Sequence, residues 1–152
     1  MTTDRDALHR DPHRAQISNM KLYTVQEANR TLPLVSRIAS DIVHAYAKWQ
    51  DAVREFEIVA AAARADLPNE RATVVQAQAQ RLAADIAGFV RELDQLGVQF
   101  KGYDLGLVDF PSLMGDRTVY LCWRLGEPDI RHWHELDAGF AGRQPIEPLA
   151  FV

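Results

Sequence analysis

Histidine, cysteine and carboxylate side chains, the residue types that bind metal ions and transfer protons, gather in one short stretch near the end of this chain. Residues 120–145 read YLCWRLGEPDIRHWHELDAGFAGRQP. They hold the single cysteine, two of the five histidines and two of the three tryptophans of the sequence. Such a concentration of uncommon residue types indicates a site and not packing alone, although it matches no catalytic motif.

The sharpest spacing in this stretch is that of His132 and His134, which stand two residues apart. On a strand, such a pair lies on one face, about 7 Å apart. Zinc takes three or four ligands, so acidic side chains would have to complete a divalent-metal site, and the candidates are Asp109, Glu135 and Asp137. The alternative is that His132 packs against a tryptophan and His134 hydrogen-bonds a backbone carbonyl.

Three arginines indicate an anion site in the same region, namely Arg124, Arg131 and Arg143. Pairing of these arginines with Glu127 and Glu135 is the competing interpretation. The glycine-rich run 139–142 can bring backbone amides to a ligand, but it lacks a dinucleotide or phosphate-loop pattern. A run of this kind more commonly forms a tight turn.

The single cysteine, Cys122, alternates with Trp123 in an apolar segment. This alternation favours an inert core thiol over a nucleophile. One cysteine cannot form an internal disulfide, which is typical of a protein from the reducing cytoplasm.

The elements that must position these residues are short strands, because the apolar period becomes two after Gly97. We expect an antiparallel meander with a turn at 115–116, and its predicted strands are 98–100, 105–110 (ended by Pro111), 118–125 and 130–135. If Leu125 faces Ile130, then Trp123 faces His132, Leu121 faces His134 and Cys122 faces Trp133. A slip of one residue would exchange these sets.

The preceding half of the chain carries a helical pattern. Thr24-Val25-Gln26-Glu27 reads as a capping box. Pro33 predicts a break or kink and is placed as the first residue of a longer helix. Apolar residues then step by three and four from Val35 to Ala63 and again from Ala72 to Leu96, with a break at 66–69 and a C-cap at Gly97. These two runs predict an antiparallel, coiled-coil-like helical hairpin.

The predicted fold is therefore α+β, with one domain over residues 20–152. It consists of the helical hairpin at 24–97 and the small antiparallel sheet with a C-terminal segment at 98–152. Residues 1–19 lack periodicity and are predicted to be a mobile tail. Each helix would be about 40 Å long, too long for the rest of the chain to cover. We therefore expect a homodimer held through the helices, the alternative being that the sheet packs along them.

Composition excludes some classes of function. The formal net charge of −4 over 152 residues argues against a nucleic-acid partner, which requires a basic face. No apolar run approaches the roughly 18 residues that span a bilayer, and the first residues form no signal peptide. The sequence thus predicts a cytoplasmic protein with neither a membrane nor a nucleic-acid partner.

Three blocks carry a family resemblance: YTVQEANRTLP, LGVQFKGYDLGLVDFP and VYLCWRLGEPDIRHWHELDAGFAGRQPI. Over about residues 22–146 the chain resembles a bacterial family known as domain of unknown function twenty-two-oh-three. The resemblance implies no established activity and supplies no catalytic residues. Two functional hypotheses follow from the residues themselves. The first is a non-catalytic protein that self-associates through its hairpin. The second is a metal-dependent enzyme, or a metal- or anion-binding protein, with its site on the sheet.

Overall fold

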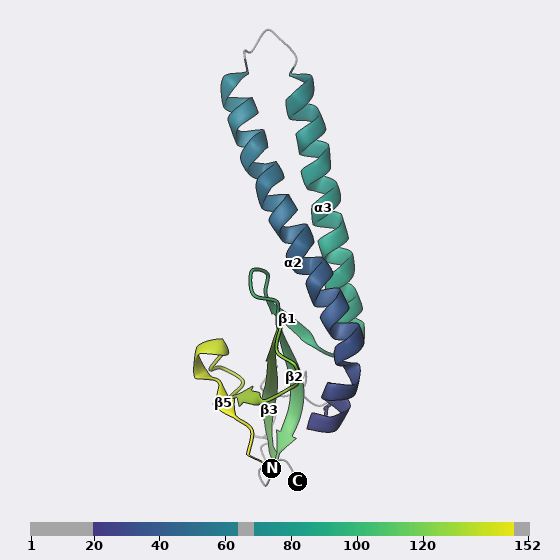
Figure 1. Ribbon diagram of the computed structural model, residues 1–152, viewed down its shortest axis with the longest axis vertical. Coiled ribbons are helices and arrows are strands. Elements are labelled where there is room, and N and C mark those ends of the chain that lie inside the picture. Colours follow the sequence, from purple (N-terminus) through teal and green to yellow (C-terminus); the bar gives the residue numbers. More distant parts are fainter. Residues whose placement is uncertain (1–19, 64–68, 148–152) are drawn as a thin grey trace, which may run out of the picture.

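The computed structural model describes residues 20–63 and 69–147, and it has two long helices beside a five-stranded antiparallel sheet (Figure 1). The helices are α2 (Val25–Ala62) and α3 (Glu70–Gln95). The sheet has the order β1-β2-β3-β4-β5, and its strands are β1 (Gln99–Gly102), β2 (Leu107–Met114), β3 (Arg117–Arg124), β4 (His132–His134) and β5 (Gln144–Pro145). The α+β prediction of a hairpin and a meander is confirmed. The tail expected at 1–19 and most of the predicted break at 66–69 lie outside the described residues.

Helix α2 begins at its predicted cap, because the Glu27 amide donates to Thr24 Oγ1 over 3.1 Å. Of the break or kink predicted at Pro33, the break is wrong, since α2 runs through this residue. Proline removes one backbone hydrogen bond, but the turns before it are held by the packing of Ala28 and Leu32 in the core. That burial offsets the missing bond and keeps the helix continuous.

Helix α3 begins at Asn69, whose side chain links the two helices. Its Oδ1 accepts from the Ala72 amide over 3.1 Å, and its Nδ2 donates to the Val59 carbonyl over 3.2 Å. The helix ends at Gln95 with Leu96 as its C-cap. Gly97, the residue predicted to cap it, follows with a φ of 77°, which glycine readily adopts.

Strand β2 does not end at Pro111 as the sequence predicted, but continues to Met114. The N and C=O of one residue in a strand point to the same edge, and the Pro111 carbonyl accepts from the Tyr23 amide over 2.6 Å. The missing N–H of Pro111 therefore points away from β3, to an edge where the pairing with β1 has already ended at Asp109. Proline costs the ladder nothing there. The turn at Gly115–Asp116 is confirmed, because Met114 pairs with Arg117.

The register proposed between β3 and β4 is wrong by one residue. Cys122 pairs with His132, Leu121 with Trp133 and Tyr120 with His134. The predicted strands left a turn of four residues, 126–129, between them. The connection is longer than that because Ile130 does not join the strand. Its amide donates to Asn29 Oδ1 on α2 over 2.8 Å, and its side chain is buried against the helices.

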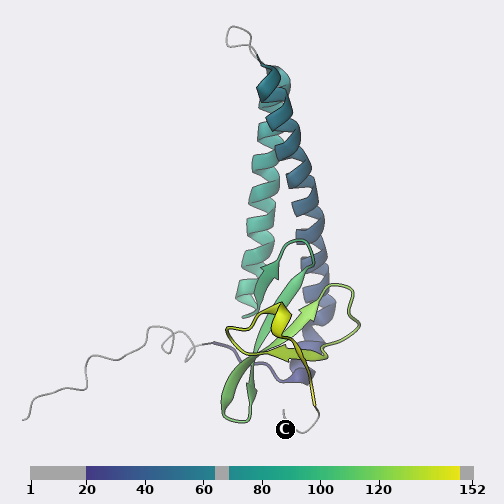
Figure 2. The same ribbon diagram turned by 90° about the vertical axis from the view of Figure 1, so that its left-hand side faces the viewer.

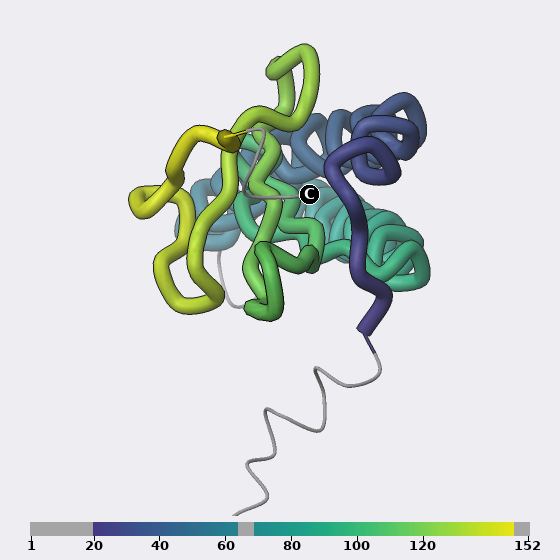
Figure 3. The backbone as a smooth tube through the Cα atoms, turned by 90° about the horizontal axis from the view of Figure 1, so that it is seen from below, coloured from purple at the N-terminus to yellow at the C-terminus, as the bar shows by residue number. Residues whose placement is uncertain are grey.

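This register divides the sheet into two faces. The core face packs on the helices and consists of Val108, Phe110, Val119, Leu121, Trp123 and Trp133. The pocket face, on the other side, carries Asp109, Tyr120, Cys122, His132 and His134. Figures 2 and 3 show the helices on one side of the sheet and the C-terminal segment, in yellow, on the other.

The sheet covers only part of the hairpin, whose far half extends beyond it (Figure 1). Helix α2 has 38 residues, or about 57 Å, which is longer than predicted. Its last buried residue is Ala52. We refer to residues 53–62 and 70–85 as the distal half of the hairpin. Neither helix of the described chain combines the length and the hydropathy needed to cross a membrane.

Candidate functional site

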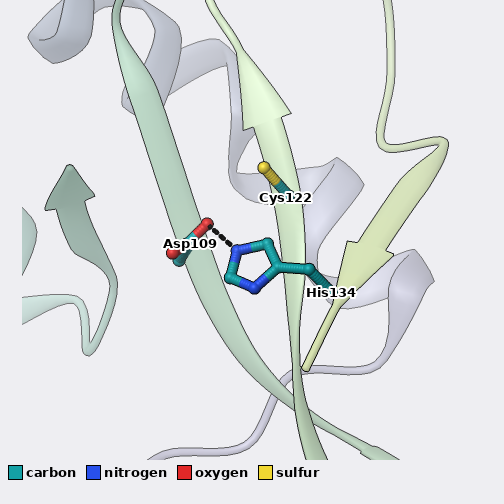
Figure 4. Close-up of side chains that lie close together, drawn as sticks. All are labelled: Asp109, Cys122 and His134. Carbon is teal, nitrogen blue, oxygen red and sulfur yellow. Dashed lines mark hydrogen bonds and ion pairs between the residues drawn. The ribbon is translucent and has the colours of Figure 1, made fainter. Parts of the chain in front are cut away.

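Three potential metal ligands from three adjacent strands meet on the pocket face. Asp109 lies on β2 directly opposite Cys122 on β3, and His134 lies on β4. One ligand atom from each residue lies within 4.8 Å of the other two. Figure 4 shows the Asp109 carboxylate and the His134 ring pointing toward each other, with the Cys122 sulfur beside them. All three side chains are buried, with exposed fractions of 4%, 1% and 2% for Asp109, Cys122 and His134.

The hydrogen bonds of His134 determine its tautomer. Its Nδ1 lies 2.6 Å from the Glu135 carbonyl oxygen, which can only accept, so Nδ1 carries a hydrogen. In a neutral imidazole Nε2 then holds a lone pair, and this atom lies 3.0 Å from Asp109 Oδ1. A lone pair facing a carboxylate oxygen is repulsive. A proton or a metal ion must lie between the two atoms.

The Cys122 thiol is held in its neutral form by its surroundings. Burial, and next the negative charge of Asp109, raise the pKa of Cys122 to about 12, while Arg143 acts in the opposite direction. A thiol with so high a pKa is not a nucleophile at neutral pH. A divalent cation beside the sulfur would reverse this balance, because coordinated thiols lose their proton.

A pocket of about 320 Å³ opens over these three residues. Its walls come from β1, β2, β3 and the segment after β4, and they consist of Lys101, Leu107, Tyr120, Leu136, Asp137, Gly139 and Phe140. A ligand in this pocket would therefore meet the Asp109, Cys122 and His134 side chains directly. The glycine-rich run forms the 3₁₀ turn η1 (Phe140–Gly142) at the pocket edge, as the tight-turn interpretation expected.

The second predicted ligand, His132, belongs to a different cluster. Its Nδ1 lies 2.7 Å from Arg143 Nη2 and 3.4 Å from Glu127 Oε2. Arg143 Nη2 also donates to both Glu127 oxygens, over 2.8 and 2.7 Å. Among the described residues, the buried Nε of Arg143 has no hydrogen-bond partner. The structure thus brings His134 and Asp109 together and gives His132 an arginine partner.

The remaining predicted site residues are distributed around these two clusters. Glu135 pairs with Arg117 over 2.9 Å, and Asp137 lines the pocket. Arg131 pairs with Asp129, whereas Arg124 is exposed. Arg131 and Arg143 therefore have different carboxylate partners.

The residue that the sequence analysis did not place in the site is Cys122. The predicted register paired Cys122 with Trp133, on the face opposite His132 and His134, and its alternation with Trp123 was interpreted as that of an inert core thiol. Asp109, in contrast, was among the proposed ligands. The sequence signal that could have identified Cys122 is the two-residue alternation of side chains along the strands. In a register shifted by one residue, His132, His134 and Cys122 share one face.

A model of the family described as uncharacterized conserved protein (DUF2203) matches residues 21–146. Neither the curated proteins nor the solved structures include a significant match to the chain. The chemistry of the site therefore has to be argued from its own geometry.

Proposed function

We propose that this chain, which belongs to the DUF2203 family of uncharacterized conserved proteins, binds one zinc-like divalent ion through Asp109, Cys122 and His134. The observation that carries the proposal is the contact of 3.0 Å between His134 Nε2 and Asp109 Oδ1. With Nδ1 bonded to a carbonyl, His134 has the tautomer of a metal ligand whose other nitrogen is fixed by the backbone. A cation removes the repulsion between the two atoms.

The distances are compatible with zinc. A tetrahedral zinc ion with such ligands keeps their donor atoms about 3.3–3.6 Å apart. The nitrogen and oxygen are 3.0 Å apart, and no pair among the three donor atoms exceeds 4.8 Å. Shifts below about 1.5 Å would therefore complete the coordination, as expected for a side-chain cluster that closes on its ion.

The ligand types favour zinc over the hard cations. Thiolate and imidazole suit zinc, whereas magnesium and calcium take oxygen ligands. Three protein ligands with a pocket above them leave one position open, the arrangement of catalytic and not of structural zinc. A free thiol persists most readily in a reducing environment, so we propose that the protein acts in the cytoplasm.

The competing arrangement is a proton shared by His134 and Asp109, which makes them a buried ion pair. Desolvation makes such a pair costly, and in it the neutral Cys122 thiol acts only as a hydrogen-bond partner of Asp109. Zinc titration by calorimetry, with magnesium for comparison, distinguishes the two arrangements. We expect wild type to bind one zinc at micromolar or lower concentration and Cys122→Ala to bind at least about 100-fold more weakly.

The matched control is His132→Ala, which changes a histidine outside the proposed centre. We expect this variant to bind zinc like wild type. Loss of zinc binding in His132→Ala together with normal binding in Cys122→Ala would assign the ion to His132 and His134. Absence of zinc binding below millimolar concentration in wild type would favour the shared proton.

A second function, self-association through the distal half of the hairpin, is supported by an apolar groove of about 250 Å³. It is lined by Trp49, Val53, Phe56, Gln76, Ala79, Gln80 and Ala83. Ile58 and Val74 nearby are 67% and 56% exposed. A second hairpin would cover these side chains, and two-fold dimers are the commonest symmetric assembly.

Sedimentation of wild type and Phe56→Asp tests the dimer. We expect a wild-type dimer at tens of micromolar and a monomeric Phe56→Asp, with an exposed variant, Glu57→Asp, as the matched control. A monomeric wild type would exclude the dimer.

A further inference from the structure

The pocket over Asp109, Cys122 and His134 contains one cation that lacks a carboxylate partner. Lys101 lines this pocket from β1, and its side chain is exposed. Its Nζ lies 5.9 Å from the centroid of the Tyr120 ring. Among the residues that the structure describes, the ion pairs do not include Lys101.

Several arginines around the sheet differ from Lys101 in this respect. Each of three nearby arginines has an acidic partner: Arg117 with Glu135, Arg131 with Asp129, and Arg143 with Glu127. Their charges are thus balanced within the chain. Arg124 is exposed and belongs to no ion pair of the described residues, but it does not line the pocket. Lys101 alone among the residues lining the pocket offers a positive charge that an incoming ligand can meet.

The metal centre does not supply a second positive charge for a ligand in the pocket. The Asp109 carboxylate and the Cys122 thiolate together neutralise the charge of a divalent ion. The metal centre can therefore bind a ligand atom at its open position, but it gives the pocket no net positive charge. Asp137 lines the same pocket from the segment after β4 and disfavours additional negative charge. The pocket therefore suits a ligand with a single negative charge.

The size of the pocket limits the ligand further. About 320 Å³ is at the low end of small-molecule sites. Leu107, Leu136 and Phe140 supply an apolar wall, which accommodates a short hydrocarbon group beside the charged end.

We propose, on the premise that the metal site above exists, that the pocket binds a small monocarboxylate. One carboxylate oxygen takes the open position of the metal, and the charge pairs with the Lys101 ammonium. A phosphate dianion, with twice the charge, is a poorer ligand beside Asp137 and a single lysine.

Cobalt-substituted protein provides the test, because its absorption spectrum distinguishes metal binding at the site from carboxylate binding to the metal. A sulfur-to-cobalt charge-transfer band in the near ultraviolet shows that the metal occupies the site with Cys122. The visible bands of cobalt respond to the ligand in the open position. We expect acetate to change the visible bands in a saturable way, acetamide to leave them unchanged, and phosphate to act only at higher concentration than acetate.

Two variants at the pocket edge sharpen the result. Lys101→Met should weaken acetate binding about five-fold, as for a partly exposed ion pair, while Lys101→Arg keeps most of the affinity. Asp137→Asn, the matched control of opposite charge, should bind acetate at least as tightly as wild type.

Each failure has a distinct meaning. Absence of the charge-transfer band would overturn the metal site and the carboxylate proposal together. A normal band with visible bands that ignore acetate, or with Lys101→Met equal to wild type, would overturn the carboxylate proposal alone.

Discussion

The two faces of the sheet use neighbouring residues of the same strands for opposite purposes. Val108 and Asp109 are adjacent, and their exposed fractions are 0% and 4%. The first is surrounded by apolar side chains, whereas the second faces an imidazole and a thiol. Burial alone therefore does not distinguish the two faces. The difference lies in whether the buried atoms need a partner.

The comparison indicates where the stability and the chemistry of the molecule reside. Apolar burial on the core face stabilises the fold by about 25 cal/mol per Å². On the pocket face, polar groups lose their hydration, which costs free energy unless each finds a partner. The pocket face, whose buried polar groups need partners, is therefore the one on which a ligand can change the stability of the protein.

The largest expected effect comes from the core face. Phe110 is fully buried and makes an edge contact with Tyr23 at 5.3 Å between ring centroids. Phe110→Ala should lower the free energy of unfolding by about 3–5 kcal/mol through cavity formation, measured by urea denaturation of zinc-free protein. The zinc affinity of the folded variant should stay that of wild type. A large loss of zinc affinity would mean that the two faces are not separable.

Zinc itself should act on the pocket face. At a free concentration of 100 times its Kd, zinc should raise the free energy of unfolding by about 2.7 kcal/mol, and a chelator should reverse the gain. In Cys122→Ala the gain should disappear, which thermal melts with and without zinc will measure. An equal gain in both proteins would place the ion elsewhere.

The high pKa of Cys122, about 12, sets the pH dependence of this effect. At neutral pH the thiol holds its proton without metal and must release it on binding, so zinc affinity rises with pH. Between pH 6 and 8 we expect at least about a tenfold gain per unit, or about 1.4 kcal/mol, in competition titrations. Calorimetry in buffers of different ionisation enthalpy should register the released proton. A pH-independent affinity would exclude Cys122 as a ligand.

The smallest effect should come from a residue on neither face. Thr24→Ala removes the N-cap of α2 and should cost about 1 kcal/mol of unfolding free energy. Zinc affinity should not change. If this variant proved less stable than Phe110→Ala in urea, the burial assigned to the core face would be wrong.

The helices and the meander could be predicted from the sequence because periodicity is a local property. Steps of three and four marked α2 and α3, and Gly97 marked the end of α3. The errors at Pro33 and Pro111 have one cause. Both depend on tertiary structure: burial of Ala28 and Leu32 offsets the hydrogen bond that Pro33 removes, and the strand edge at Pro111 does not use the missing N–H.

The site was less predictable because it depends on register. The connection from β3 to β4 is lengthened by the bond between Ile130 and Asn29, residues 101 positions apart. No local pattern contains that bond. It shifts Cys122 to the face of His134, so an interaction with a distant helix decides which residue types meet in the pocket.

The short segment before α2 also has a consequence for synthesis on the ribosome. The Tyr23 hydroxyl donates to the Leu96 carbonyl, and the Tyr23 amide donates to Pro111, which is far later in the chain. Chains emerge N-terminus first at about 5–20 residues per second, so these bonds form one after the other. The hairpin can form its local contacts early. The Tyr23 amide, in contrast, has no partner on β2 until Pro111 is synthesised, several seconds after Tyr23 itself. Tyr23 is thus made early but is among the last residues to be fully bonded, and nascent chains that stop before Pro111 will expose it to proteases.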